Sequence, residues 1–147
     1  MDGRRELDWM EELAAAHPTQ TFRVGIRVNF DLEKMCPGQT TMGEAGGRFG
    51  FSYENGTFAA VLERVQRIPN VEVTGLHLHS SSKSRSVAVF EAIASMACKL
   101  SGIFPEPAYV DLGAVIAAVW KGVRSIRIIF RLWRRFYKKN LRQKKQC

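Results

Sequence analysis

Strand and helix patterns alternate along the chain, and their order constrains the fold more than any other feature of the sequence. In residues 22–30 and 71–79 the residue types alternate with a period of two, which predicts strands, and a short third strand is expected before Gly113. The stretches between them repeat apolar residues at helical spacing, and a further helix is expected to end at Pro18. The predicted elements are a helix over 7–16, a strand over 22–30, a helix over 55–68, a strand over 71–79, a helix over 87–100 and a strand over 109–112. Strands separated by helices pair in parallel, so the predicted fold class is α/β.

A long loop is expected over residues 31–50, after the first predicted strand. This stretch carries five of the twelve glycines and also Pro37. Loops of that length are uncommon in compact domains unless they serve a site.

The stretch 71–85, VEVTGLHLHSSSKSR, is expected to carry the chemistry of the chain. Its alternation predicts that both histidines lie on one face of a strand. A serine-rich, cationic turn follows and leads into the next helix. Backbone N–H groups, hydroxyls and the helix dipole favour a bound anion such as phosphate at such a position. The face predicted for the histidines consists of Val71, Val73, Gly75, His77 and His79.

Two histidines on one strand face could also be metal ligands. No third or fourth ligand stands at a recognisable spacing, so no metal site is predicted. His77 by itself is expected to pack in the interior. Arg27 and Asn29 are expected to face the same interior in structural roles.

Four motifs, in the same order along the chain, resemble those of one family. They are VGIRVNF at 24–30, GGRFGF at 46–51, GLHLHSSSKS at 75–84 and YVDLG at 109–113. The family is that of the pyridoxal-phosphate decarboxylases built on the alanine-racemase-like barrel, which includes the diaminopimelate, ornithine and arginine decarboxylases. The resemblance implies a (β/α) barrel, pyridoxal 5'-phosphate as cofactor, an amino-acid substrate and a homodimer. Because a complete barrel needs about 250 residues, a chain of 147 residues predicts a partial barrel.

The resemblance also implies site residues. His79 matches the histidine that stacks on the cofactor ring, and Ser82 matches the serine that binds its phosphate. Gly113 matches the start of the glycine-rich phosphate loop, and Arg48 matches a basic residue that supports the site. From the residues alone, a serine-rich helix cap and a solvated loop arginine are the alternatives. Ser81 departs from the glycine that the family often has one residue before the serine.

The lysine that the family uses has no counterpart in this sequence. By resemblance it lies on the first barrel strand, upstream of all four motifs, and the family's C-terminal β-domain is missing too. Lys34, Lys83 and Lys99, which precede the basic tail, do not match that position. A Schiff base needs an amine held against the cofactor aldehyde. We therefore expect a decarboxylase fragment that is inactive alone, and we assign no catalytic residue.

The net charge of +8 is unevenly distributed. Residues 1–112 carry eleven basic and fourteen acidic side chains, whereas residues 113–147 carry eleven basic and no acidic ones. The second segment repeats apolar residues at helical spacing opposite its basic ones, which is typical of a basic amphipathic helix. The expected division is a partial pyridoxal phosphate-binding barrel over 1–113 and a basic helical tail over 114–147. A second hypothesis is that the tail binds a membrane surface or, without sequence specificity, nucleic acid.

The tail is also consistent with translation in a shifted reading frame. Alanine codons begin with GC and valine codons with GT, so regrouping the bases after Gly113 can give glycine codons. The regrouped bases can spell Gly-Gly-Tyr-Cys-Gly-Gly, which restores the loop that the family has after YVDLG. Codons read out of frame were never selected for a folded surface, so the lack of acids is expected of them. We favour this interpretation over a functional basic helix.

Cysteine usage and hydropathy indicate a cytoplasmic protein. Cys36, Cys98 and Cys147 are odd in number and lack metal-ligand spacing, which favours reduced thiols. The first residues are too charged for a secretory signal. The longest apolar run, 114–120, is far shorter than the roughly 20 residues of a membrane span.

Overall fold

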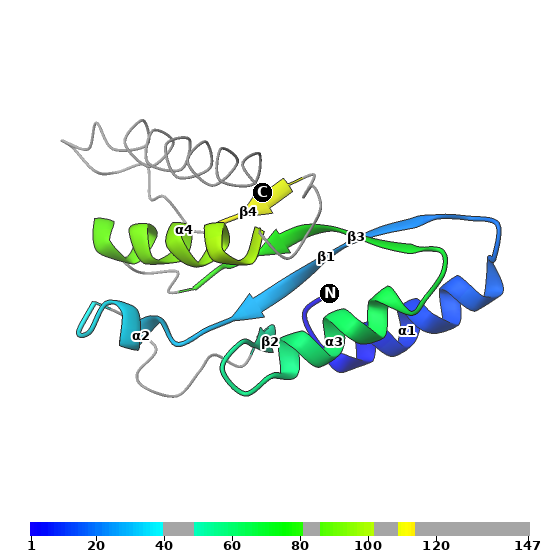
Figure 1. The fold of residues 1–147 in the computed structure, drawn as a ribbon, viewed down its shortest axis with the longest axis horizontal. Coiled ribbons are helices and arrows are strands. Elements are labelled where there is room, and N and C mark those ends of the chain that lie inside the picture. Colours follow the sequence, from blue (N-terminus) through cyan, green and yellow to red (C-terminus); the bar gives the residue numbers. More distant parts are fainter. Residues whose placement is uncertain (40–48, 81–85, 102–108, 114–147) are drawn as a thin grey trace, which may run out of the picture.

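The computed structural model describes residues 1–39, 49–80, 86–101 and 109–113 (Figure 1). Its elements are α1 (Arg4–Ala16), β1 (Phe22–Asn29), α2 (Leu32–Met35), β2 (Phe51–Ser52), α3 (Thr57–Gln66), β3 (Val71–His77), α4 (Val87–Ser101) and β4 (Tyr109–Asp111). The strands form one sheet in the order β2-β1-β3-β4, in which every neighbouring pair is parallel. The predicted α/β class is confirmed, with parallel strands and alternating helices. The basic helix predicted over 114–147 lies outside the described residues.

Two short elements lie in or beside the stretch for which a long loop is predicted. α2 begins after Asp31, whose carboxylate accepts a hydrogen bond from the Lys34 N–H at 2.9 Å, as an N-cap does. The Cys36 thiol donates to the Leu32 carbonyl at 3.2 Å at the other end. A four-residue helix is too short to show a hydrophobic period, so the sequence pattern does not indicate it. β2 pairs with the last residues of β1.

Helices α1 and α3 lie side by side below the sheet in Figure 1, and Arg64 joins them. Its guanidinium donates to Asp8 at 2.8 Å and to both carboxylate oxygens of Glu11 at 2.6 Å. These ion pairs are on the surface, where such pairs add little stability individually.

Asn70, directly before β3, closes the C-terminal end of α1. Its side-chain amide nitrogen donates to the carbonyl oxygens of Ala14, His17 and Gln20, each at 3.0 Å. The last carbonyls of a helix have no partner within the helix. Asn70, which is far from α1 in the sequence, therefore provides hydrogen bonds to carbonyl groups at the end of this helix. The sequence predicts that end before Pro18.

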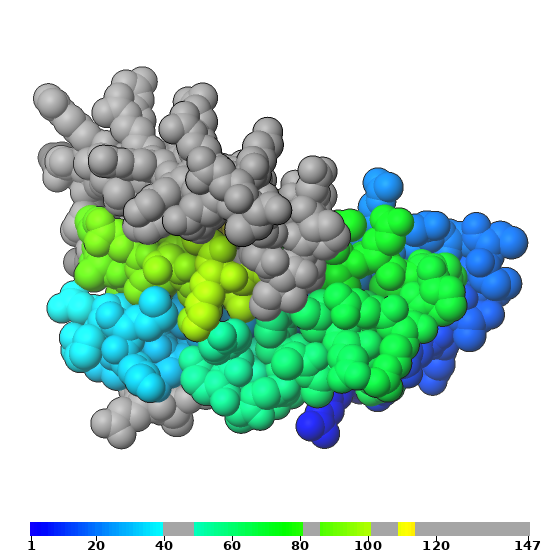
Figure 2. All heavy atoms as spheres, in the orientation of Figure 1, coloured from blue at the N-terminus to red at the C-terminus, as the bar shows by residue number. Residues whose placement is uncertain are grey.

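The apolar face of the sheet packs with the helices in one core. The largest fully buried side chains come from α1, β1, α3, β3 and α4, and from the residue that follows β3: Phe58, Leu7, Ile26, Leu76, Leu78, Ile93, Leu100, Val28, Val65 and Val89. Each such burial contributes roughly 1.5–3 kcal/mol to folding. α2 packs against α4, and Figure 2 shows the two helices as adjoining parts of the surface, in cyan and yellow-green. Within the described residues, no helix is both long and apolar enough to cross a bilayer.

A β-bulge in β3 corrects the predicted strand face. Val24 pairs with Val73, but the next residue of β1, Gly25, pairs with Gly75, so Thr74 has no partner in β1. An extra residue in one strand reverses the alternation of its side chains relative to the partner. Val71 and Val73 therefore share the face of Phe22 and Val24, opposite the histidines, and the prediction for these two valines is wrong. Val71 is 7% exposed and belongs to the apolar core.

Candidate functional site

Polar and small residues line up in rows on the face of the sheet opposite the core residues of β1 and β3. We call this side the histidine face. Paired residues of neighbouring strands project to the same side, so each row crosses β1, β3 and β4 in that order. The first row is Gly25, Gly75 and Tyr109, and the second is Arg27, His77 and Asp111. His79 and Gly113 follow beyond the carboxyl ends of β3 and β4. Ligand sites in barrels of parallel strands lie at such carboxyl ends.

In the first row, one aromatic ring lies across two glycines. A Cβ on Gly75 would stand 2.1 Å from Cζ of Tyr109, and a Cβ on Gly25 would stand 2.0 Å from its hydroxyl oxygen. The Tyr109 ring therefore occupies the space that side chains at both glycines would fill. The two strands need glycine at these positions because the tyrosine of a third strand lies across them.

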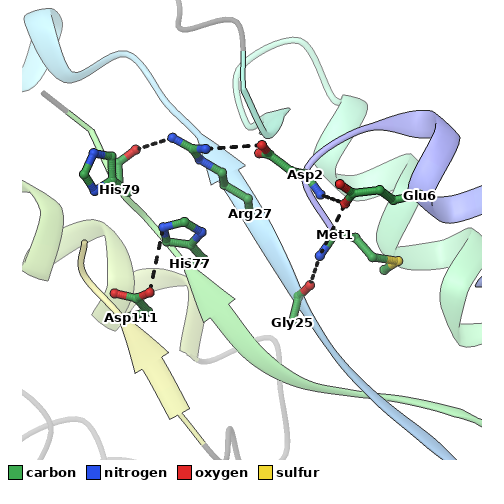
Figure 3. A network of polar contacts seen from close by, with 8 residues as sticks. All are labelled: Met1, Asp2, Glu6, Gly25, Arg27, His77, His79 and Asp111. Atoms are coloured by element: carbon green, nitrogen blue, oxygen red, sulfur yellow. Dashed lines mark hydrogen bonds and ion pairs between the residues drawn. The ribbon is translucent and has the colours of Figure 1, made fainter. Parts of the chain in front are cut away.

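The second row places an imidazole between a cation and an anion. Nε2 of His77 is 3.8 Å from Oδ2 of Asp111 (Figure 3). Burial lowers the pKa of His77 from its ordinary value, Asp111 opposes that shift, and Arg27 and His79 add to it. The neutral imidazole is therefore the stable form of His77 at neutral pH.

Arg27 connects three segments of the chain at this edge of the sheet. One guanidinium nitrogen donates to the backbone carbonyl of His79 at 3.2 Å, and another donates to the Asp2 carboxylate at 3.3 Å (Figure 3). The guanidinium also lies over the Phe49 ring, 5.1 Å from its centroid. The Arg27 side chain is only 17% exposed. Its charge is thus neutralised by Asp2, and its donors hold the backbone at His79.

The first two residues pair with β1 like a short additional strand. The Met1 ammonium donates to the Gly25 carbonyl at 2.6 Å, and the Arg27 N–H donates to the Met1 carbonyl at 2.9 Å. On the other side, the Gly50 N–H donates to the Asp2 carbonyl at 3.0 Å. This pairing is what brings the Asp2 carboxylate to Arg27.

Gly113 lies directly against His79. Its backbone is in the left-handed region, with φ of +62°, and its N–H donates to the Asp111 carboxylate at 2.7 Å. A Cβ added to Gly113 would stand 2.3 Å from Nδ1, 2.4 Å from Cβ and 2.6 Å from Cα of His79. Only glycine fits both the backbone conformation and the space beside His79.

The structure brings together two of the four site residues predicted from the sequence. His79 and Gly113 are in contact, while Ser82 and Arg48 lie outside the described residues. The ring centroids of His77 and His79 are 6.0 Å apart, which agrees with their predicted common face. Within the described ranges, no three His, Cys, Asp or Glu side chains are grouped so as to hold a metal ion.

Sequence reasoning missed Tyr109, Asp111 and Asp2. The first two could have been found, because Tyr109, Asp111 and Gly113 alternate along YVDLG and so share a face. Nothing near Asp2 in the sequence indicates its partner, since the contact with Arg27 depends on the pairing of Met1 with β1.

Comparisons with known proteins agree on one family. The family model for the pyridoxal binding domain of pyridoxal-dependent decarboxylases matches residues 2–107. No curated protein matches the sequence significantly.

Two solved structures share the fold. Diaminopimelate decarboxylase from M. jannaschii, solved with L-lysine, aligns with a TM-score of 0.58 and 21% identity, covering 75% of this chain and 26% of that one. A point mutant of diaminopimelate decarboxylase from Helicobacter pylori, also with L-lysine, aligns with a TM-score of 0.61 and 18% identity, covering 95% of this chain and 35% of that one. The chain thus spans about a quarter to a third of these enzymes. It belongs to the pyridoxal-dependent decarboxylase family and carries part of its pyridoxal binding domain.

Proposed function

We propose that this chain provides the surface on which the ring of pyridoxal phosphate lies in an amino-acid decarboxylase. The observation that carries the proposal is the contact between His79 and Gly113 at the carboxyl ends of adjacent parallel strands. A planar imidazole at that position can stack on a planar cofactor ring. In the second row, Arg27 donates to the His79 carbonyl and so holds the backbone that carries the imidazole.

The described residues fit the ring of this cofactor better than they fit its aldehyde. His79 offers a flat surface, Gly113 leaves room beside it, and Arg27 fixes its carbonyl group. When bound, pyridoxal phosphate supplies the electron sink for loss of the α-carboxylate. Of the lysines in the described part, Lys34 lies on α2, and the Nζ of Lys99 lies 4.7 Å from the centroid of the Tyr53 ring. Neither belongs to the rows of the histidine face.

The whole activity of the family needs groups beyond those described. We propose that a complete relative of this chain removes the α-carboxylate of a basic or diamino acid and acts as a homodimer. The two structural neighbours, which are diaminopimelate decarboxylases bound to L-lysine, support a substrate of that class. The chain by itself is proposed to bind the cofactor without covalent attachment and to catalyse no decarboxylation. The alternative of a membrane or nucleic-acid contact rests on residues 114–147, which lie outside the described residues.

Binding of pyridoxal phosphate to the purified 147-residue chain tests the proposal. We expect weak, reversible binding that His79→Ala abolishes, because the stacking surface is lost. His17→Ala is the matched control, since His17 lies at the end of α1, away from the histidine face. Equal binding by both variants, or none by the unchanged chain, would overturn the proposed role.

A further inference from the structure

Gly113 lies against a part of His79 whose backbone is held by hydrogen bonds to two neighbouring strands. The N–H of the preceding residue, Leu78, donates to the Asp111 carbonyl at 2.8 Å, and the His79 carbonyl accepts from Arg27 at 3.2 Å. The backbone is therefore held on both sides of His79: the peptide group that joins His77 to Leu78 is bonded to β4, and the one that follows His79 is bonded to Arg27 of β1. A Cβ on Gly113 would approach the His79 Cα, which is backbone, to 2.6 Å.

We propose that Gly113 is a positioning residue for the His79 imidazole: it leaves the space that His79 needs to face the cofactor ring. The cofactor part of this inference rests on the proposed function, whereas the contact itself does not. Any side chain at residue 113 would have to displace either the imidazole or the pinned backbone of His79. The requirement for glycine then comes from packing against His79 and not from the backbone conformation alone.

Another glycine of this chain separates these two causes. Gly38 has a similar positive φ, +72° against +62° at Gly113, but a Cβ on Gly38 would meet no atom of the described residues within 4 Å. Asparagine tolerates the left-handed region better than other residues with a side chain. Replacing either glycine by asparagine therefore imposes a similar backbone cost, and only at residue 113 does it also impose the contact with His79.

The experiment compares Gly113→Asn with Gly38→Asn in the full chain labelled with ¹⁵N-histidine. The chain has three histidines, and His17 serves as the internal reference. We expect Gly113→Asn to shift the imidazole signals of His79 and to leave those of His17 unchanged, while Gly38→Asn shifts neither. Pyridoxine 5'-phosphate, which lacks the aldehyde, is the probe of the cofactor site. Its dissociation constant should rise on the order of tenfold or more with Gly113→Asn, as expected when a binding group is misplaced, and stay unchanged with Gly38→Asn.

The outcomes distinguish this inference from the proposed function. Unchanged His79 signals in Gly113→Asn would overturn the positioning role, and so would a shifted signal with unchanged affinity for pyridoxine phosphate. If the unchanged chain does not bind the probe, the proposed function fails, and the histidine signals still decide the contact. Should Gly113→Asn not fold, the double variant with His79→Gly removes the Nδ1 and Cβ atoms that the new side chain meets. The His79 Cα stays 2.6 Å from the new Cβ, so a partial gain in stability over Gly113→Asn would support the contact, and no gain at all would overturn it.

Discussion

Replacing Asn70 should cost the fold a measurable part of its stability, because one side chain satisfies three carbonyl groups. The amide nitrogen of Asn70 has two hydrogens, which it shares among the oxygens of Ala14, His17 and Gln20, each at 3.0 Å. A hydrogen bond contributes about 1 kcal/mol net, so Asn70→Ala should lower the free energy of unfolding by about 2 kcal/mol. Water can replace the amide at the exposed carbonyls, which keeps the loss from being larger.

The measurement is urea denaturation followed by circular dichroism. With an m-value of about 1–3 kcal/mol/M, the midpoint should fall by roughly 1 M urea. Gln66→Ala is the matched control, because it removes an exposed carboxamide from α3, and a change within about 0.5 kcal/mol is expected for such a surface position.

Asn70→Asp tests the reasoning more sharply than the alanine variant does. Aspartate keeps the shape of the side chain but places an oxygen where the amide nitrogen donates to three carbonyl oxygens. Like-charged groups would then face one another, so this variant should be less stable than Asn70→Ala. If Asn70→Asp is as stable as Asn70→Ala or more so, the amide nitrogen does not face these carbonyls, and the assigned role of Asn70 is wrong.

Three further predictions concern the histidine face and the tail. Because burial lowers the pKa of His77 below 6.5 in the folded chain, the unfolded chain binds more protons in the acidic range. The stability that depends on neutral His77 is therefore fully present above pH 6.5 and is lost as the pH falls through the folded pKa. Between about pH 7 and pH 5, the urea midpoint of His77→Gln should fall by less than that of the unchanged chain. An equal fall in the two proteins would refute the assignment. Borohydride reduction with pyridoxal phosphate should leave no adduct on one specific lysine, as read by peptide mass spectrometry, and a single modified lysine together with decarboxylation would contradict this. Sequencing the locus should show a shifted frame after Gly113 that encodes a Gly-Gly-Tyr run, and the basic helix becomes the leading interpretation if that run is missing.

The order of strands and helices could be predicted from the sequence because it depends on local patterns. β1 and α3 bury one side each, and that burial appears as a period of two or of 3.6 residues. The bulge at Thr74 could not be predicted in this way, because it exists only in the pairing of β3 with β1. α2 was missed because its four residues are held by the Asp31 cap and not by a long apolar stripe.

The candidate site could be predicted where one strand supplies neighbouring residues. His77 ends β3 and His79 lies two residues beyond it, so their common face could be predicted from spacing alone. The contacts of His79 with Arg27 and Gly113 join segments far apart in the sequence. The geometry of these contacts follows from the order of the parallel strands β1, β3 and β4. Residue spacing within a single strand does not predict that order.

The Tyr109 ring that covers Gly25 and Gly75 has a consequence for how relatives of this chain can vary. The three positions share one volume, because a Cβ on Gly25 or Gly75 would stand 2.0 or 2.1 Å from an atom of the tyrosine, which is far inside van der Waals contact. A relative with a larger residue at position 25 or 75 is therefore expected to carry a smaller one at position 109. Substitutions at these three sites should be inherited together, even though each lies on a different strand and the three are far apart in the sequence.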